Sequence, residues 1–394
     1  MKYTVELRTV LVLSLIITLI LSTWIVSSRY QKLRAYQHTE LIIGNGNYNF
    51  SGATSITLQL LPYQAKQIPL VVLGHHYIPS SYKTINYLDY LILSHMPHPE
   101  GKKRVFYTRR NIEMIQALIA KYIFFSPVKT IFSATSQRPH TFITRWLTHH
   151  MDGVVSTSKK AAQYLAYAPD AIIPHGIDGN HFNYRQNKLT AWKELGYPGE
   201  IGIGHFSRIR PSKGVDIIVH AAINVLPKFP QATLIIAGET QAKDVAYRQQ
   251  LIETVKAHHL EKRILFVGLV PYDKLPKHYQ GISIVAALSR NEGYGLTPLE
   301  GMATGASALV SDTGVWKELV EPYKHGLVVP TNDIKKTEQA LYSLLKDIKK
   351  TQAMGRHSAV TISNHYTAKI EADRIIAFVK QIQKEKIPRK ILAQ

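Results

Sequence analysis

Short apolar segments alternate with longer amphipathic segments along most of this chain. The short segments are rich in Val and Ile and are almost continuously apolar, which is typical of strands that are buried on both faces of a sheet. Turn-forming residues bound most of them. We expect strands at residues 41–44, 70–74, 105–108, 130–134, 153–156, 171–174, 201–206, 233–237, 264–267, 282–286, 308–311 and 326–329.

Helical patterns fill most of the gaps between these strands, for example at residues 215–226, 247–258 and 336–349. Strands that are separated by helices predict parallel sheets with helices on both faces. So many strands suit two sheets better than one. We therefore predict an α/β protein with two Rossmann-like, doubly wound domains that face each other across a cleft. Ligands bind at the carboxyl ends of the strands in this architecture.

The length of 394 residues also suits two α/β domains. A polar stretch with Gly and Pro at residues 183–199 predicts the break between them. We place an N-terminal membrane anchor at residues 1–35, a first domain at 36–190 and a second domain at 191–365. The basic helical pattern at residues 366–394 is interpreted as a C-terminal helix that crosses back to the first domain.

An uncharged apolar run at residues 10–26 has basic residues on both sides. A run of this length is at the short end of what crosses a membrane as a helix. We interpret it as a single-pass anchor in a bacterial inner membrane. The basic residues after it favour a protein body on the cytoplasmic face. The alternative is a secretory signal peptide that is cleaved near Val26 and Ser28.

The chain carries 48 Lys and Arg against 27 Asp and Glu, a formal net charge of +21. A surplus this large indicates an anionic partner. No nucleic-acid-binding motif occurs, so we expect no nucleic acid and favour inner-membrane lipid or a phosphorylated glycolipid. Cysteine is absent, which excludes disulfides, thiolate metal sites and cysteine nucleophiles.

A glycine-rich loop with two carboxylates stands out at residues 291–303, with the sequence NEGYGLTPLEGMA. It follows a predicted strand and opens a helix, and its glycines let backbone N–H groups approach an anion closely. Glu292 and Glu300 flank these N–H groups, and carboxylates accept hydrogen bonds from vicinal hydroxyls. The loop therefore suits a phosphate with a sugar at one end and a ribose at the other.

A structural role is the alternative for Glu300. Thr297 and Glu300 have the spacing of a capping box, with Pro298 at the first helical position. In that interpretation Glu300 stabilises the start of its own helix and contacts no ligand. Glu292 lies outside the capping pattern.

Two cations follow another predicted strand at residues 205–214, which read HFSRIRPSKG. Arg208 and Lys213 would lie at the carboxyl end of that strand, where they could bracket a diphosphate and stabilise its developing charge. Ser212 is the predicted N-cap of the following helix. The alternative is a pair of solvated surface cations, and Arg210 is interpreted as a bystander.

Together, these two segments resemble the retaining GT-B glycosyltransferases of family 4. That family pairs a G-R-L-x-x-x-K-G motif with an E-x7-E motif, and both spacings occur here, with Ser207 in place of the first glycine. Further similar segments follow in the same order. They are IPHGID at residues 173–178, IIAGE at 235–239, FVG at 266–268 and SDTGVWKELV at 311–320.

The resemblance implies a role for each matching residue. Arg208 and Lys213 would bind the donor diphosphate and stabilise it as leaving group, Glu292 would contact the transferred sugar, and Glu300 would hold the ribose. The full set of donor-binding residues that it implies is Gly52, Ser207, Arg208, Lys213, Gly268, Glu292, Gly293, Tyr294, Gly295, Leu296 and Glu300.

The first half of the chain contains NFSGATSITLQLLP at residues 49–62, YTRRNIEM at 107–114 and SATSQRPHTFITRWLTHHMDGVVSTS at 133–158. These segments resemble, more narrowly, bacterial lipopolysaccharide core mannosyltransferases, which use GDP-mannose. The likeness implies that a hexose, here mannose, moves onto a lipopolysaccharide core or related envelope glycolipid. His140 matches a histidine that the family often places near the reacting carbon, so we include it among the catalytic candidates. Arg109, Arg110 and Arg138 are the candidates for binding an acceptor phosphate.

The family retains the anomeric configuration, with the nucleotide sugar as co-substrate and without a resident cofactor. No metal is expected either, since the chain lacks the Asp-x-Asp triplet of metal-dependent glycosyltransferases. Three alternatives stay open. They are a UDP- or ADP-sugar as donor, a nucleotide-sugar epimerase of the same fold, and a catalytically inactive, membrane-tethered glycan-binding protein.

Overall fold

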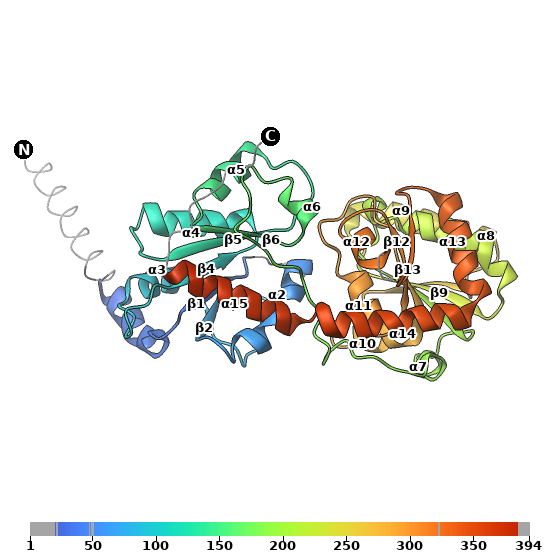
Figure 1. Cartoon of the computed structure of the whole chain (residues 1–394), viewed down its shortest axis with the longest axis horizontal. Coiled ribbons are helices and arrows are strands. Elements are labelled where there is room, and N and C mark those ends of the chain that lie inside the picture. The colour runs from blue at the N-terminus through green and yellow to red at the C-terminus, as the bar shows by residue number, and fades with distance from the viewer. Residues whose placement is uncertain (1–19, 21–22, 47, 49–50, 322–323, 385–394) are drawn as a thin grey trace, which may run out of the picture. The chain divides into compact units, whose positions relative to one another are not determined.

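The computed structural model of the chain describes residues 20, 23–46, 48, 51–321 and 324–384 (Figure 1). They form two compact units. The first unit holds the described residues up to Ser133, then Thr141–Val155 and the described residues from Ile376 onward; the second holds Ala134–His140 and Ser156–Ile375. The domain boundaries at residues 36–190 and 191–365 stay a prediction.

The first sheet has seven strands in the order β3-β2-β1-β4-β5-β6-β7. The neighbours β2–β3, β1–β2, β1–β4 and β4–β5 pair in parallel. The order reverses at β1 and β4, so the loops after these two strands leave the sheet side by side. The strands are β1 (Leu41–Gly44), β2 (Leu70–Leu73), β3 (Thr84–Ile85), β4 (Val105–Thr108), β5 (Lys129–Ala134), β6 (Gly153–Ser156) and β7 (Ala171–Ile172).

The second sheet has six strands in the order β10-β9-β8-β11-β12-β13, and every neighbouring pair is parallel. Its order reverses at β8 and β11, which places the loops after these strands next to each other. Both predicted donor motifs lie in these loops. The strands are β8 (Ile201–Phe206), β9 (Ala232–Ala237), β10 (Ile264–Gly268), β11 (Ile282–Ala287), β12 (Ser307–Ser311) and β13 (Gly326–Val329).

Helices connect the strands within both units (Figure 1). In the first half of the chain they are α2 (Gly52–Gln64), α3 (Tyr87–His95), α4 (Asn111–Tyr122), α5 (Phe142–His149) and α6 (Lys159–Ala162). The others are α7 (Lys188–Glu194), α8 (Val215–Val225), α9 (Val245–Ala257), α10 (Leu275–Gly281), α11 (Thr297–Ala303), α12 (Trp316–Val320), α13 (Ile334–Lys346), α14 (Ile348–His365) and α15 (Ala368–Lys384). Short 3-10 helices are η1 (Arg34–Tyr36), η2 (Pro211–Lys213), η3 (Leu226–Lys228) and η4 (Ala242–Asp244).

The second sheet is buried on both faces because its strands are apolar throughout. Along β8 and β11, alternate residues turn to opposite faces. Ile203 and Ile284 join one apolar cluster, which also includes residues of α8 and α13. Phe206 and Val285 join the other cluster, which includes residues of α11 and α12. This two-sided burial explains why the strand sequences lack an alternating polar pattern.

Helix α15 begins in the second unit and ends in the first. At its start, the Ala368 N–H donates to the Ile177 carbonyl at 2.9 Å. Near its end, the side-chain amide of Gln383 donates to the Lys103 carbonyl at 2.9 Å and to Glu40 at 3.2 Å. The helix is held at both ends by residues that lie far from it in the sequence.

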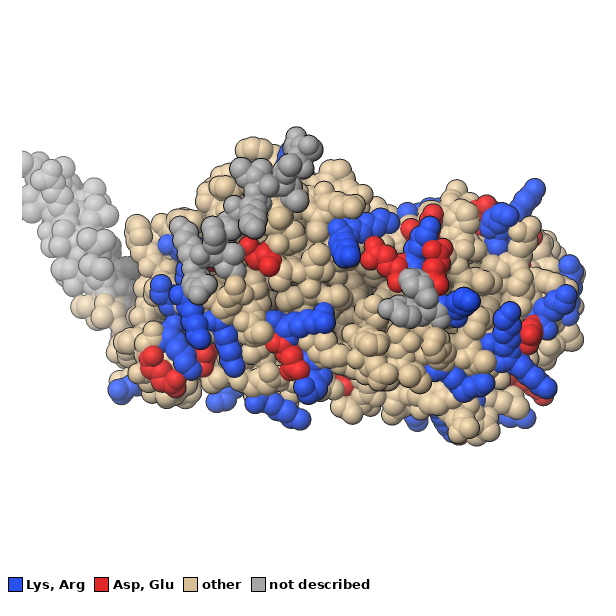
Figure 2. Space-filling view, viewed as in Figure 1, with Lys and Arg blue, Asp and Glu red and all other residues tan. Residues whose placement is uncertain are grey.

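Basic side chains are spread over the visible face of both units, with acidic residues among them (Figure 2). They do not gather into a single stripe in this view. Ion pairs such as Lys102–Glu40 bring opposite charges together on the surface.

Within the expected membrane anchor at residues 1–35, the apolar run at residues 10–26 lies largely outside the described residues. Within the part of the chain that the structure does describe, no helix combines the length and the apolar character that a bilayer span requires. This finding corrects the expected location as a single-pass protein of a bacterial inner membrane with its body on the cytoplasmic face.

Candidate active site

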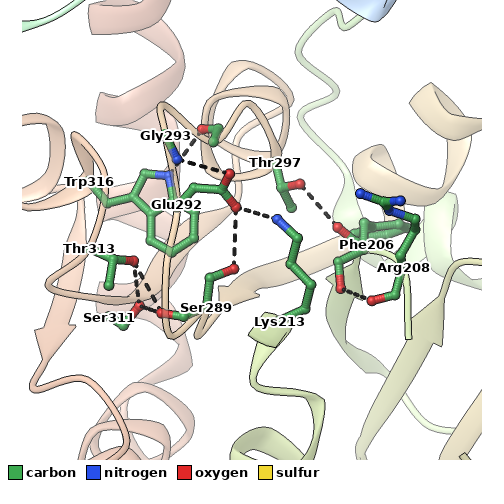
Figure 3. Close-up of polar contacts among 12 residues, drawn as sticks. Phe206, Arg208, Lys213, Ser289, Glu292, Gly293, Thr297, Ser311, Thr313 and Trp316 are labelled. Atoms are coloured by element: carbon green, nitrogen blue, oxygen red, sulfur yellow. Dashed lines mark hydrogen bonds and ion pairs between the residues drawn. The ribbon is translucent and has the colours of Figure 1, made fainter. Parts of the chain in front are cut away.

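Lys213 and Glu292 meet where the loops after β8 and β11 run side by side (Figure 3). The Lys213 ammonium donates a hydrogen bond to one carboxylate oxygen of Glu292. That oxygen also accepts from the Ser289 hydroxyl at 3.3 Å, while the other accepts from the Gly293 N–H at 3.3 Å. Both charged side chains are less than one-fifth exposed. Two residues that the motifs singled out, 79 positions apart, thus share one small site.

The glycine of the first motif is required by a close approach of the two loops. Gly214 has a φ of +65°, and a Cβ atom there would lie 1.9 Å from the Leu288 carbonyl oxygen. It is also the residue before α8, and no side chain caps that helix. The predicted N-cap role of Ser212 is therefore wrong, because Ser212 lies one turn earlier, inside η2.

Arg290 joins the same two loops and was missed by the sequence analysis. Its backbone N–H donates to the Ser212 carbonyl at 2.9 Å. Its guanidinium forms two hydrogen bonds to the Asp216 carboxylate, at 2.9 and 2.6 Å. The guanidinium holds the pKa of that carboxyl below its ordinary value, against the opposing effect of burial. The sequence signal was a cation in the loop that follows a predicted strand.

Arg208 lies between β8 and α8, as Lys213 does, and it is exposed (Figure 3). Ser207 precedes it, and its hydroxyl donates to the Arg208 carbonyl at 3.1 Å and lies 2.9 Å from Nε2 of His205. Ser207 is not among the described non-glycine residues with positive φ. The backbone therefore tolerates serine where the family motif has glycine. Burial lowers the pKa of His205 to about 4, so this histidine is neutral near physiological pH.

The glycine-rich loop is shaped by close packing. Gly295 has a φ of +82°, and a Cβ atom there would lie within 2.4 to 2.6 Å of the Trp316 ring. The Trp316 indole N–H donates to the Gly295 carbonyl at 3.0 Å. Tyr294 is buried between the two glycines, and Leu296 is the N-cap residue of α11. The loop therefore has one backbone path that only glycine at position 295 permits.

Glu300 is buried in α11 and faces Tyr279. Its side chain is 7% exposed and accepts a hydrogen bond from the Tyr279 hydroxyl at 2.8 Å. Burial raises the pKa of Glu300 to about 7, although this hydrogen bond acts in the opposite direction. The capping-box alternative is wrong, since Thr297 lies inside α11 and its hydroxyl donates to the Phe206 carbonyl at 3.0 Å.

Gly268 ends β10 at the same edge of the second sheet. Its φ is +76°, and an added Cβ atom would meet nothing within 4 Å. Its carbonyl accepts from the Gly238 N–H at 2.8 Å. The next residue, Leu269, is 70% exposed. The end of β10 is therefore open to solvent.

In the first unit, Arg109 and Arg110 follow β4 at the reversal of strand order. The buried carboxylate of Glu113 accepts from the Arg109 N–H at 2.7 Å and from the Gly46 N–H at 3.2 Å. The Arg109 guanidinium donates to a threonine hydroxyl at 3.0 Å. The Arg110 guanidinium donates to Ser51, the residue before Gly52, at 2.6 Å. Glu113 was not anticipated, because a carboxylate near the start of a helix usually has only a local role.

Arg138 and His140 lie in the loop after β5 and belong to the second unit. Arg138 is exposed and His140 is half-buried. Among the described residues, no group of three or more His, Asp and Glu side chains is placed to hold a metal ion. The expectation that the reaction needs no metal stays a prediction.

Comparisons with known proteins agree with the motifs. Residues 190–359 match the family of glycosyl transferases group 1. Over 350 residues the chain is 33% identical to the lipopolysaccharide core biosynthesis mannosyltransferase LpsB of Rhizobium meliloti, and the match covers 88% of this chain and 98% of the relative. The chain belongs to the glycosyl transferases group 1.

This glycosyltransferase is also 33% identical over 337 residues to the lipopolysaccharide core biosynthesis mannosyltransferase LpcC of Rhizobium leguminosarum bv. viciae. That match covers 85% of the chain and 94% of the relative. The fold is similar to that of Anabaena HepE, crystallised with UDP and glucose. The TM-score is 0.74 at 17% identity, over 87% of this chain and all of that one. The family that the motifs indicated is confirmed, and the glycosyltransferase is an enzyme with a GT-B-like fold.

Proposed function

We propose that this glycosyltransferase moves mannose from GDP-mannose onto a lipopolysaccharide core or related envelope glycolipid, with retention of configuration. Two relatives that match most of the chain are named lipopolysaccharide core mannosyltransferases, and this supports both substrates. The observation that carries the proposal is the meeting of Lys213, Glu292 and the Gly293 N–H at the reversal of strand order.

The donor diphosphate takes its place beside Lys213 and Arg208. An ammonium and a guanidinium near a diphosphate form charge-assisted hydrogen bonds, which are stronger than neutral ones. The backbone at residues 293–296 adds N–H groups that can point at the same anion. In the described structure Glu292 neutralises Lys213, so the diphosphate exchanges one anionic partner of the lysine for another.

Glu292 then accepts hydrogen bonds from hydroxyls of the transferred sugar, and Glu300 from the ribose. Glu292 lies in the loop after β11 and Glu300 in α11, eight positions further along the chain. Gly268 leaves room for the base at the end of β10. Each end of the donor therefore meets a carboxylate, with the cations between them.

The reaction breaks the bond between the anomeric carbon and the diphosphate oxygen, whose electron pair leaves with the diphosphate. The acceptor hydroxyl attacks from the same face, and its proton passes to the departing diphosphate. Such a step needs positioning and a preorganised positive site, without a protein nucleophile or a metal. Arg208 and Lys213 supply that site. In the acceptor role we place Arg109, Arg110 and Arg138, with His140 near the reacting carbon.

A thermal-shift panel tests the donor. GDP-mannose, UDP-glucose, UDP-N-acetylglucosamine and ADP-heptose are each added to the purified protein, and stabilisation grows with the logarithm of ligand concentration over Kd. We expect GDP-mannose to stabilise most. Stabilisation by a UDP- or ADP-sugar without a response to GDP-mannose would overturn the mannosyl assignment. The anomeric configuration of the product, read by NMR, tests retention separately, since an inverted product contradicts same-face attack.

A further inference from the structure

A buried histidine and a buried glutamate join two distant segments of the second unit. His175 follows β7, and Glu371 lies in the first turn of α15; they are 2% and 3% exposed. The Nδ1 atom of His175 lies 2.7 Å from one Glu371 oxygen. The other oxygen accepts from the Gly176 N–H at 2.8 Å. One carboxylate therefore holds both a side chain and the backbone of the segment after β7.

The backbones of these two segments are also in direct contact. The Ile177 N–H donates to the Tyr366 carbonyl at 2.8 Å, and the Ile177 carbonyl accepts from Ala368 at 2.9 Å. Gly176 is packed so closely that an added Cβ atom would lie 2.1 Å from the Thr367 carbonyl oxygen. The segment after β7 and the start of α15 therefore form one tightly connected piece.

Tyr294 connects this piece to the glycine-rich loop. Its hydroxyl donates to the His175 carbonyl at 3.0 Å, and the two rings pack edge to face with centroids 4.7 Å apart. On the other side of the loop, Trp316 donates to the Gly295 carbonyl. The backbone between Gly293 and Leu296 is thus held from two sides, once through a hydroxyl and once through an indole.

Stability alone is a weak reason for burying a carboxyl group beside an imidazole. Burying polar, ionisable groups costs solvation energy that the contacts between them often fail to exceed, and apolar replacements are frequently as stable. A buried pair can instead fix one arrangement of the groups around it. Here the group next to the pair is the loop whose N–H groups are proposed to face the donor.

We propose that Glu371 and His175 are positioning residues that, through the Tyr294 hydroxyl, set the backbone of the glycine-rich loop for sugar transfer. The inference rests on the proposed donor site. Neither Glu371 nor His175 touches the donor in this arrangement. Their effect passes along the chain of contacts Glu371–His175–Tyr294, and it acts on the rate of transfer more than on the fold.

Tyr294→Phe tests the last contact, because it keeps the ring and removes only the hydroxyl. Loss of one such hydrogen bond in the transition state corresponds to roughly a three- to tenfold lower kcat. The matched control is Tyr87→Phe, which removes a hydroxyl bond to the Gln116 carbonyl at 2.9 Å in the first unit. Tyr294→Phe should lose more thermal stability, because its hydroxyl bond is fully buried, and only Tyr294→Phe should lose kcat.

Glu371→Ala and Glu371→Gln test the pair itself. Glutamine can still accept a hydrogen bond from Gly176 or His175, so we expect it to retain more activity than alanine. Amide hydrogen exchange of peptides spanning residues 291–297 provides a readout that needs no substrate. We expect faster exchange there in Tyr294→Phe and Glu371→Gln than in the wild type and in Tyr87→Phe.

Two results would overturn the inference: unchanged exchange of the loop amides in both variants, or an unchanged kcat in Tyr294→Phe. Transfer is measured with GDP-mannose, or with the panel donor that the wild type turns over. A Lys213→Ala variant is assayed alongside, since it tests the donor site directly. If Lys213→Ala keeps its kcat, the proposed donor site fails, whatever the exchange data say about Tyr294.

Discussion

Lys213 and Glu292 neutralise each other in a site that is less than one-fifth exposed at either side chain. A lysine held in this way is already aimed and partly desolvated before a donor arrives, so it needs little reorganisation to meet a diphosphate. The electrostatic attraction between its ammonium group and an anion is also stronger there than on an open surface. The ion pair therefore argues against the alternative that Lys213 is a solvated surface cation. Arg208, in contrast, is exposed.

Lys213→Ala should lower kcat more than it raises the donor KM, because the charge on the diphosphate grows as the glycosyl bond breaks. A charge-assisted contact contributes about 1.5–3 kcal/mol, which is roughly 10- to 100-fold in rate. Steady-state kinetics with varied donor measures both constants. Arg210→Ala is the control from the same loop and should change neither. A wild-type kcat in Lys213→Ala would remove the lysine from the mechanism.

Glu300 predicts a pH dependence of donor binding. Its pKa is raised to about 7, so the carboxyl is largely neutral below that pH and ionised above it. Ribose hydroxyls donate more strongly to the ionised form, so the affinity for GDP-mannose should rise by up to about tenfold between about pH 6 and about pH 8. Calorimetric titration measures this. In Glu300→Gln the affinity should be low at both pH values, and an equally steep pH dependence in that variant would contradict the assignment.

The raised pKa of Glu300 also affects the stability of the fold, which should fall as the pH rises, whereas donor affinity should increase. The folded protein holds the Glu300 proton more tightly than the unfolded chain, whose carboxyl has a pKa of 4.5. The contribution of Glu300 to the free energy of unfolding is therefore greatest below about pH 4.5, and it declines as the pH rises towards 7. Glu300→Gln removes that decline, so urea unfolding at several pH values separates the two effects.

At this scale, sequence reasoning predicted which loops meet better than it predicted the local contacts. The motifs of Arg208 and Lys213 and of Glu292 and Glu300 each follow a predicted strand, and the structure brings the two loops together because parallel strands end at one edge of a sheet. The roles of these residues stay predictions. Arg290 and Tyr279 escaped notice, since their partners Asp216 and Glu300 lie far away in sequence. The capping box failed because tertiary contacts used the Thr297 hydroxyl and the Glu300 carboxylate instead.

At the scale of elements, the loop between β11 and α11 depends on glycine for two separate reasons. Position 295 has a left-handed backbone, which costs a residue with a Cβ atom about 1–2 kcal/mol. The Trp316 ring also fills the space that a Cβ atom would need. The backbone cost applies wherever a residue with a Cβ atom has a left-handed conformation, whereas the clash depends on the Trp316 ring at this position.

Gly295→Ala and Gly196→Ala separate these effects. Gly196 has a φ of +72°, close to that of Gly295, but nothing lies within 4 Å of an added Cβ atom. We expect Gly196→Ala to lower the free energy of unfolding by about 1 kcal/mol with normal activity. Gly295→Ala should lower it by about 1–3 kcal/mol more and reduce transfer, because the indole must move. Equal losses in both variants, measured by urea unfolding, would contradict the packing argument.

The elements themselves were well predicted from the pattern of apolar residues. β1, β4, β6, β8 and β13 have the expected bounds, because each is a continuous apolar run in a sheet that is covered on both faces. β3 was missed, since it has only two residues. Helix ends were less accurate: the pattern at residues 336–349 runs across a break at Asp347, where α13 gives way to α14.

At the scale of the whole molecule, α15 completes the apolar core of the first unit. Ile382 and Val379 are fully buried, and the Ile382 and Phe378 side chains pack against Gly153. Gly153 leaves the space that these side chains occupy, since an added Cβ atom would lie 2.8 Å from the Ile382 Cδ1 atom. The last helix is therefore part of the core of the unit in which the chain begins.

Ile382→Ala should lower the free energy of unfolding by about 2–5 kcal/mol, through lost apolar burial and the cavity that remains. Lys380→Ala lies on the exposed side of the same helix and should change it by about 0.5 kcal/mol or less. Urea unfolding curves measure both. A small loss in Ile382→Ala would show that α15 docks loosely on the first unit.

Because α15 lies at the end of the described chain, the order of synthesis matters for the first unit. Strands β1 to β6 leave the ribosome long before Phe378 and Ile382 have been made, although these residues fill space beside Gly153. Domains generally fold as they emerge, the N-terminal one first. Here part of the apolar surface of the first unit stays uncovered until the whole of the second sheet has been translated.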